Sequence, residues 1–128
     1  MKLSTLLTIN AIVAILFGLG FLLIPDTLLS WYAVDLPVAG IFISRLLGAA
    51  FVAFATVSWE VRAAESAADS SALRAILLAF FIGDILGALI SLIYQVDGVA
   101  NALGWTTVIL YLLLGLGFGY FSLRRMSA

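Results

Sequence analysis

The chain has 128 residues, of which 65% are hydrophobic and only 10% carry a charged side chain. Soluble domains contain about 25% charged residues, so this composition excludes a small water-soluble domain and predicts an integral membrane protein. The net charge of −1 argues against nucleic acid as a partner, and the absence of Cys and His removes disulfides, thiol chemistry and the usual zinc, haem and copper ligands.

Long apolar runs follow one another along the chain. A helix needs about 20 apolar residues to cross the hydrocarbon core of a bilayer. We expect four spans, at about residues 3–25, 38–60, 74–96 and 101–123, which form one domain, an all-α integral membrane four-helix bundle. Between the first two spans, Asp26 is suited to cap a short helix that lies in the membrane interface.

The basic residues indicate the orientation of this bundle. Five of the six Lys and Arg residues precede the first span, flank the polar loop Ser66–Ser71 or follow the last span, whereas the opposite loops carry Asp but no Lys or Arg. The positive-inside rule then places both termini in the cytoplasm. The five residues are Lys2, Arg62, Arg74, Arg124 and Arg125.

Two charged residues lie inside apolar runs, Arg45 in the second and Asp84 in the third. A charge at that depth costs about 2.5–3.5 kcal/mol on insertion scales, so we expect such a residue to have a partner, a proton or a functional role. At 1.5 Å per residue, their heights in the antiparallel spans differ by about 8 Å, which an arginine side chain can largely cover. We predict a buried pair or network between them. The alternative is that Arg45 extends to the outer interface and Asp84 is a neutral, hydrogen-bonded acid.

Other polar side chains extend this cluster. Ser91 and Gln95 follow Asp84 at helical spacing, and Asn10 in the first span needs a hydrogen-bond partner from another helix. With Arg45, these residues form a predicted polar cluster that either binds a ligand or holds the helices together.

Glycines mark the predicted positions of close helix packing. They are Gly48, and Gly83 and Gly87, which form a GxxxG pattern around Asp84. The glycines between residues 115 and 119 alternate rather than follow helical spacing, so they indicate packing only weakly.

The segments Leu22–Pro25 and Ser44–Ala50, together with Gly83-Asp84, form a pattern that resembles small bacterial four-helix proteins of the DoxX-like group. Those proteins show a proline that closes the first span and an Arg-Leu-x-Gly-like start to the second. The resemblance implies a four-helix bundle in the bacterial inner membrane, and some proteins of the group are subunits of quinone-linked oxidoreductases. It carries over no catalytic residue, and Arg45 is the one position typical of the pattern.

The sequence leaves three functions open. It contains no phosphate loop, no paired catalytic carboxylates, no nucleophile–base constellation and no predicted metal site, so we expect a non-enzymatic protein. The first hypothesis is an accessory or assembly subunit of a larger membrane complex, such as a quinone-linked oxidoreductase, or a homo-oligomer. The second is a binder or carrier of a quinone, lipid or carotenoid. The third is a small proton-coupled transporter that uses Asp84.

Overall fold

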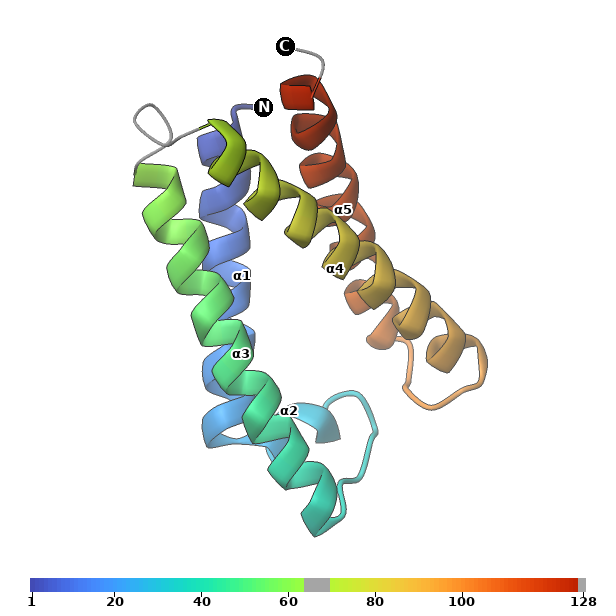
Figure 1. Cartoon of the computed structure of the whole chain (residues 1–128). Coiled ribbons are helices and arrows are strands. Elements are labelled where there is room, and N and C mark those ends of the chain that lie inside the picture. Colours follow the sequence, from blue (N-terminus) through green and yellow to red (C-terminus); the bar gives the residue numbers. More distant parts are fainter. Residues whose placement is uncertain (64–69, 127–128) are drawn as a thin grey trace.

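The computed structural model describes residues 1–63 and 70–126, and these residues form five helices. They are α1 (Leu3–Leu23), α2 (Pro25–Ser30), α3 (Val38–Ala63), α4 (Ser70–Val96) and α5 (Gly104–Met126) (Figure 1). All except α2 are long and apolar enough to cross a membrane. The four predicted spans are therefore confirmed, and the protein is a multi-pass, all-helical membrane protein.

The ends of the helices differ from the predicted spans. α3 continues to Ala63 rather than to residue 60, α4 begins at Ser70 rather than at 74, and α5 begins at Gly104 rather than at 101. Hydropathy marks where a helix lies in lipid, but the backbone hydrogen bonding of α3 and α4 continues beyond that point. α5 begins later because residues 102–103 form a turn, in which the Leu103 N–H donates to the Asn101 side chain. Of the predicted loop Ser66–Ser71, the first four residues lie outside the described part of the chain, and the last two belong to α4.

The short helix α2 is set off from α1 by Pro25. Proline lacks the N–H that would continue α1, but its fixed φ suits the first turn of a new helix. Asp26, which we expected as the cap, instead lies in the first turn, and Ile24 occupies the N-cap position without a side-chain hydrogen bond. The short helix between the first two spans is thus confirmed, but proline determines where it begins.

The long helices pack as two pairs, α1 with α3 and α4 with α5, whereas α3 and α4 do not pack along each other (Figure 1). The first pair crosses at Gly18 and Gly48. A Cβ atom on Gly48 would lie only 2.8 Å from the carbonyl oxygen of Gly18 and from the backbone nitrogen of Leu22. The two backbones therefore approach as closely as glycine permits.

The α5 glycines face two different helices. A Cβ on Gly119 would lie 2.8 Å from the ring of Phe81 in α4, and Gly115 contacts the same helix. Gly117 instead faces α1, where its added Cβ would lie 3.0 Å from the side chain of Leu6. Residues four apart share a helix face and residues two apart do not, so the alternation reflects two neighbours rather than weak packing.

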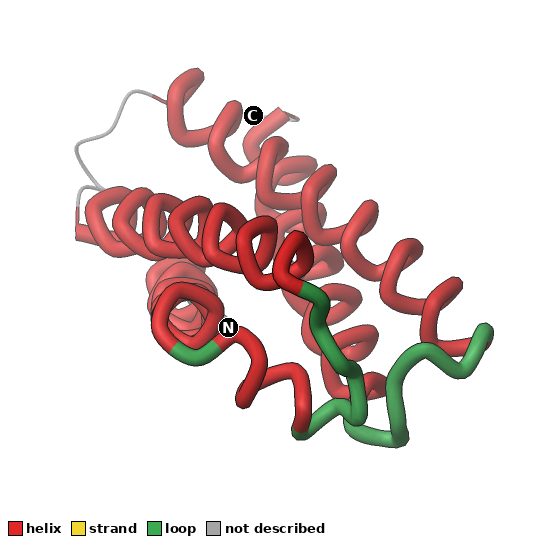
Figure 2. Tube along the Cα trace, turned by 90° about the horizontal axis from the view of Figure 1, so that it is seen from below, coloured by secondary structure: helices red, strands yellow, loops and turns green. Residues whose placement is uncertain are grey.

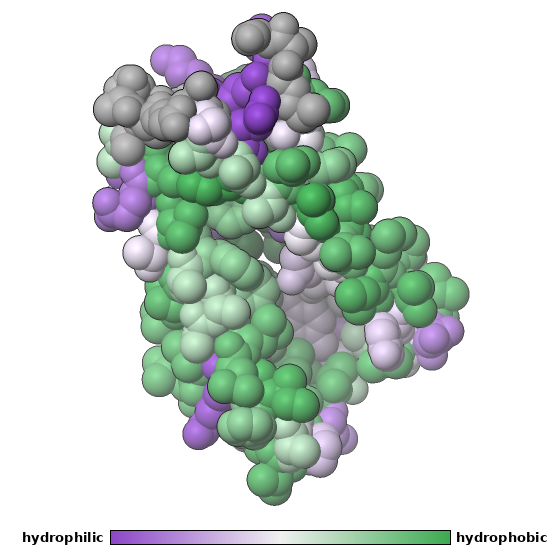
Figure 3. Space-filling model, in the orientation of Figure 1, coloured by the Kyte–Doolittle hydropathy of each residue, from purple (hydrophilic) through white to green (hydrophobic). Residues whose placement is uncertain are grey.

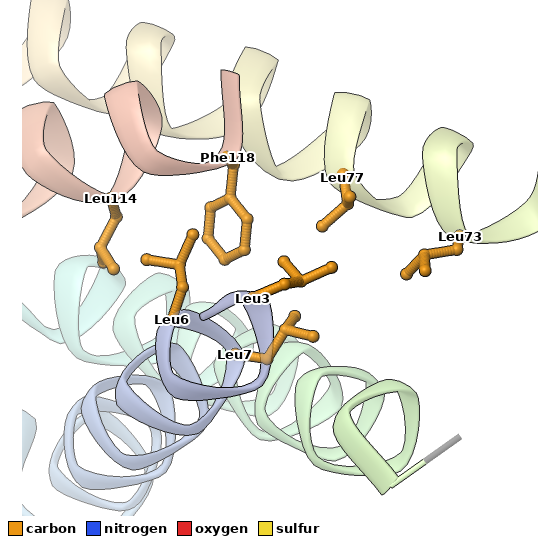
Figure 4. Close-up of a cluster of buried hydrophobic side chains, with 7 residues drawn as sticks. All are labelled: Leu3, Leu6, Leu7, Leu73, Leu77, Leu114 and Phe118. Atoms are coloured by element: carbon orange, nitrogen blue, oxygen red, sulfur yellow. The ribbon is translucent and has the colours of Figure 1, made fainter. Parts of the chain in front are cut away.

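The two pairs meet at the end that carries both termini. A cluster of buried apolar side chains from α1, α4 and α5 joins them there, and from this end the pairs diverge toward α2 (Figures 1 and 4). Phe118 lies in this cluster with no exposed surface. The full set is Leu3, Leu6, Leu7, Leu73, Leu77, Leu114 and Phe118.

Hydrogen bonds tie the pairs together at the opposite end. The backbone N–H of Asn101 donates to the Tyr32 carbonyl at 3.0 Å, and its side-chain Nδ2 donates to the Trp31 carbonyl at 3.0 Å. Asn101 Oδ1 accepts a bond from the Leu103 N–H at 3.0 Å. The loop after α4 and the chain after α2 lie on the same side of the molecule, as Figure 2 shows. The pairs are thus joined at both ends and separated in between.

Replacing Gly48 with Ala should destabilise the protein by about 1–3 kcal/mol, because the new Cβ would press against two backbone atoms of α1 that cannot rotate away. Gly83→Ala is the matched control, since a Cβ there meets nothing within 4 Å and alanine favours the helix by up to about 1 kcal/mol. Unfolding of both variants in mixtures of mild detergent and dodecyl sulfate measures the difference. Equal stability of the two variants would contradict the close crossing of α1 and α3.

Candidate functional site

The divergence of the two pairs leaves a cavity of about 310 Å³ between them, lined by residues of all five helices. In the space-filling view it is a hollow on the face where α3 and α4 separate (Figure 3). Small-molecule pockets have volumes of about 300–1,000 Å³. The cavity therefore admits a small molecule, or the head group of a larger one whose chain remains in lipid.

Four of the five residues of the predicted polar cluster line this cavity, namely Asn10, Asp84, Ser91 and Gln95. Asn10 is held in place by the expected bond to another helix, since its Nδ2 donates to Ser58 Oγ of α3 at 2.8 Å. Gln95 Nε2 donates to the carbonyl of the loop residue Asn101 at 3.0 Å, so its amide also supports the outer end of the cavity.

Arg45 does not join the cluster. Its side chain is exposed and does not line the cavity, and Oδ2 of Asp84 has no hydrogen-bond partner in the part of the chain that the structure describes. The predicted pair is therefore not formed. The reason is rotational: Leu47 lines the cavity, and two residues turn a helix by about 200°, so Arg45 lies on nearly the opposite side of α3. Similar height in the membrane was not sufficient, and extension of Arg45 to the interface stays a prediction.

Two glycines make room for Asp84 and for Tyr111, its neighbour on α5. A Cβ on Gly115 would lie 3.2 Å from the Cβ of Asp84, and a Cβ on Gly87 would lie 2.6 Å from Cε1 of Tyr111. Gly87 thus accommodates the tyrosine ring, and both side chains border the cavity. Gly83, the other glycine of the GxxxG pattern, has no side chain or backbone of another helix within 4 Å of such a Cβ.

Phenylalanine rings form a continuous apolar path beside the polar groups. The centroids of Phe17 and Phe21 lie 6.3 Å apart, and those of Phe21 and Phe51 lie 6.0 Å apart; all three rings line the cavity. The path continues from α3 through α4 to α5, over Phe54, Phe80 and Phe118, with centroid separations of 6.3, 6.3 and 5.0 Å.

Sequence reasoning missed this path because its rings come from four helices. Helical spacing relates only neighbours on one helix, such as Phe17 and Phe21 at i and i+4, or Phe51 and Phe54 at i and i+3. These two pairs were the available signal. Nothing in the sequence indicated that these two phenylalanine pairs, one on α1 and one on α3, face each other.

Comparison of the chain with protein-family models, with curated proteins and with solved structures finds no match. The fold and the cavity define a class all the same: a four-span membrane protein with a largely apolar cavity, which carries a few polar groups, between two helix pairs. The resemblance to the DoxX-like group stays a prediction.

Replacing Asn101 with Ala should loosen the outer end of the cavity, because it removes both side-chain hydrogen bonds of this residue. We expect a loss of about 1–3 kcal/mol in stability and a broader distance distribution between nitroxide labels at Ser30→Cys and Ala102→Cys, measured by pulsed electron paramagnetic resonance. Thr106→Ala is the control, since the Thr106 hydroxyl donates only to the nearby Leu103 carbonyl. An unchanged distribution in the Asn101 variant would show that the loop does not depend on these bonds.

Proposed function

We propose that the protein binds a hydrophobic small molecule that enters from the bilayer between α3 and α4. The observation that carries the proposal is the position of the cavity, which lies between the two helix pairs and is hollowed on the face where α3 and α4 separate (Figure 3). A molecule dissolved in the membrane would reach it without passing through water.

The composition of the walls supports an amphipathic ligand. Asp84, Ser91 and Asn10 supply polar groups deep in the protein, while phenylalanine rings and aliphatic side chains cover the remaining surface. Apolar walls with a few polar groups that fix orientation are typical of small-molecule sites. Quinones, lipids and carotenoids are the ligand classes that this combination admits.

A second candidate function is that of a non-enzymatic accessory subunit in a larger membrane complex. Gly83 favours it, because nothing within 4 Å occupies the space beside this residue of α4, and small residues allow a helix of another protein or of a second copy to approach closely. The resemblance to the DoxX-like group supports the same proposal, since some of those proteins are subunits of quinone-linked oxidoreductases. The two functions are compatible, because Gly83 does not line the cavity.

We further propose that the protein lies in a bacterial inner membrane with both termini in the cytoplasm. The N-termini of α1 and α4 lie at the same end of the molecule as the C-termini of α3 and α5 (Figure 1). Lys2, Arg62, Arg74 and the pair Arg124-Arg125 belong to that end, which by the positive-inside rule is cytoplasmic.

Single cysteines test this orientation. On intact cells, a membrane-impermeant thiol reagent should label Ser30→Cys, which lies at the exposed end of α2, and should not label Ser66→Cys. Permeabilised cells provide the control, since both positions should then react. Labelling of Ser66→Cys without Ser30→Cys on intact cells would reverse the proposed topology.

Filling the cavity should abolish ligand binding. Leu110→Trp adds bulk to a residue that lines the cavity, whereas Leu113→Trp adds the same bulk to a residue of the same helix that is 63% exposed and lies outside it. Native mass spectrometry of protein purified in a mild detergent should show a bound small molecule on the wild type and on Leu113→Trp. Its occupancy should fall by about tenfold or more on Leu110→Trp, since overpacking costs about 1–3 kcal/mol.

The same measurement separates the alternatives. Co-purification of other polypeptides in a fixed ratio, with no small molecule bound, would favour the accessory subunit alone. A protein that isolates alone and moves protons with a substrate in vesicles, unless Asp84 is replaced by Asn, would be a transporter and would displace both proposals.

A further inference from the structure

The cavity has one formally charged group. Among the described residues that line it, Asp84 is the only Asp, Glu, Lys or Arg, and Arg45 is turned away on the other side of α3. An anionic head group would meet a carboxyl with no positive side chain to compensate it, in surroundings where an unpaired charge is costly. Phosphates and carboxylates therefore do not suit this site.

Asp84 also presents an unused acceptor. Its Oδ2 atom is buried, and it has no hydrogen-bond partner among the described residues. A quinone head group carries only acceptors, so it leaves this oxygen without a donor unless Asp84 itself holds a proton. A positively charged head group, in contrast, supplies the opposite charge that the lining residues do not provide for this carboxylate.

Aromatic rings surround the same space. Besides the three phenylalanines, the rings of Tyr32, Tyr94 and Tyr111 line the cavity. The face of an aromatic ring attracts a cation within about 6 Å of its centroid, and this attraction is largest where water is excluded. Of these rings, Tyr111 is the neighbour of Asp84. A carboxyl group beside an aromatic ring is thus a suitable environment for an ammonium group, and the phenylalanine path suits the apolar part of the same molecule.

We propose that the ligand of this cavity is a lipophilic ammonium compound, whose cationic head group lies against Asp84 and the ring of Tyr111 while its apolar chain extends between α3 and α4 toward the lipid. This inference rests on the proposed function and narrows it, because it replaces the three ligand classes quinone, lipid and carotenoid with one class, the lipophilic ammonium compounds. Asp84 acts as the counter-ion, and no other side chain in the lining can take that role.

Two isosteric probes isolate the charge. The first is N,N-dimethyl-4-hexylbenzylamine, which is protonated at neutral pH and carries one N–H donor, and the second is its neutral analogue, in which a C–H group replaces the N–H group. A short-chain benzoquinone is the third probe. Binding of each to the full chain in phosphatidylcholine nanodiscs is measured by equilibrium dialysis, and empty nanodiscs correct for partition into lipid. The cation should bind at least about tenfold more tightly than its neutral analogue, as expected when a charged group gains a partner.

Variants assign the preference to Asp84. Asp84→Asn should bind both isosteres equally, whereas Asp84→Glu should keep the preference for the cation. Asp97→Asn is the matched control, because this exposed carboxylate lies in the loop after α4 and outside the cavity, so the preference should persist. If Asp84→Asn does not fold, the Glu variant and the Asp97 control still test the proposal through the two isosteres.

The outcomes distinguish this inference from the function on which it rests. Equal binding of the isosteres, or tighter binding of the quinone, with loss of binding in Leu110→Trp, overturns the ammonium assignment and leaves the binding function intact. Loss of the cation preference in Asp97→Asn would overturn it as well, because a surface charge would then be responsible. Failure of all three probes to bind above the empty-nanodisc level would count against both the inference and the proposed function.

Discussion

The apolar contact around Phe118 is the feature on which the rest of the structure depends. It joins α1 to α4 and α5 at the end that carries both termini, and the two helix pairs diverge from it (Figure 4). In lipid, apolar side chains gain little by leaving their surroundings, so helices associate through close packing rather than through burial from water. Leu6 against Gly117 is one such fit. Without this contact, the described residues would hold the pairs together through the hydrogen bonds of Asn101, the bond from the Thr107 hydroxyl to the Tyr32 hydroxyl and the ring contact of Phe54 with Phe80.

Close packing within each pair is what leaves space between the pairs. The Gly18–Gly48 crossing fixes α3 on α1, and Gly115 and Gly119 fix α4 on α5. Each pair is therefore closely packed within itself, while α3 and α4 do not pack along each other. The cavity is thus a consequence of where glycines permit close contact between helices.

The candidate site combines a polar environment and an aromatic one, which one helix could not provide. α4 supplies Asp84 and Ser91, α1 supplies Asn10, and the rings come from α1, α3 and α5 as well. A carboxyl group at this depth is tolerable because the protein, not lipid, surrounds it. The open side between α3 and α4 connects this polar interior with the membrane, which is the arrangement that a lipophilic ligand requires. The outward position of Gly83 remains free for a protein contact at the same time.

Composition and hydropathy determined the membrane location, the four spans and the short helix at Pro25, because the cost of apolar surface in water and of polar backbone in lipid depends on sequence alone. Helical spacing also brought Asp84, Ser91 and Gln95 to one face of α4. Only the tertiary structure decided which faces meet. It turned Arg45 away from Asp84, divided the α5 glycines between two neighbours and assembled the phenylalanine path from separate helices. These outcomes depend on the rotation of each helix about its axis, and rotation is set by side-chain contacts between helices, which no single apolar run encodes.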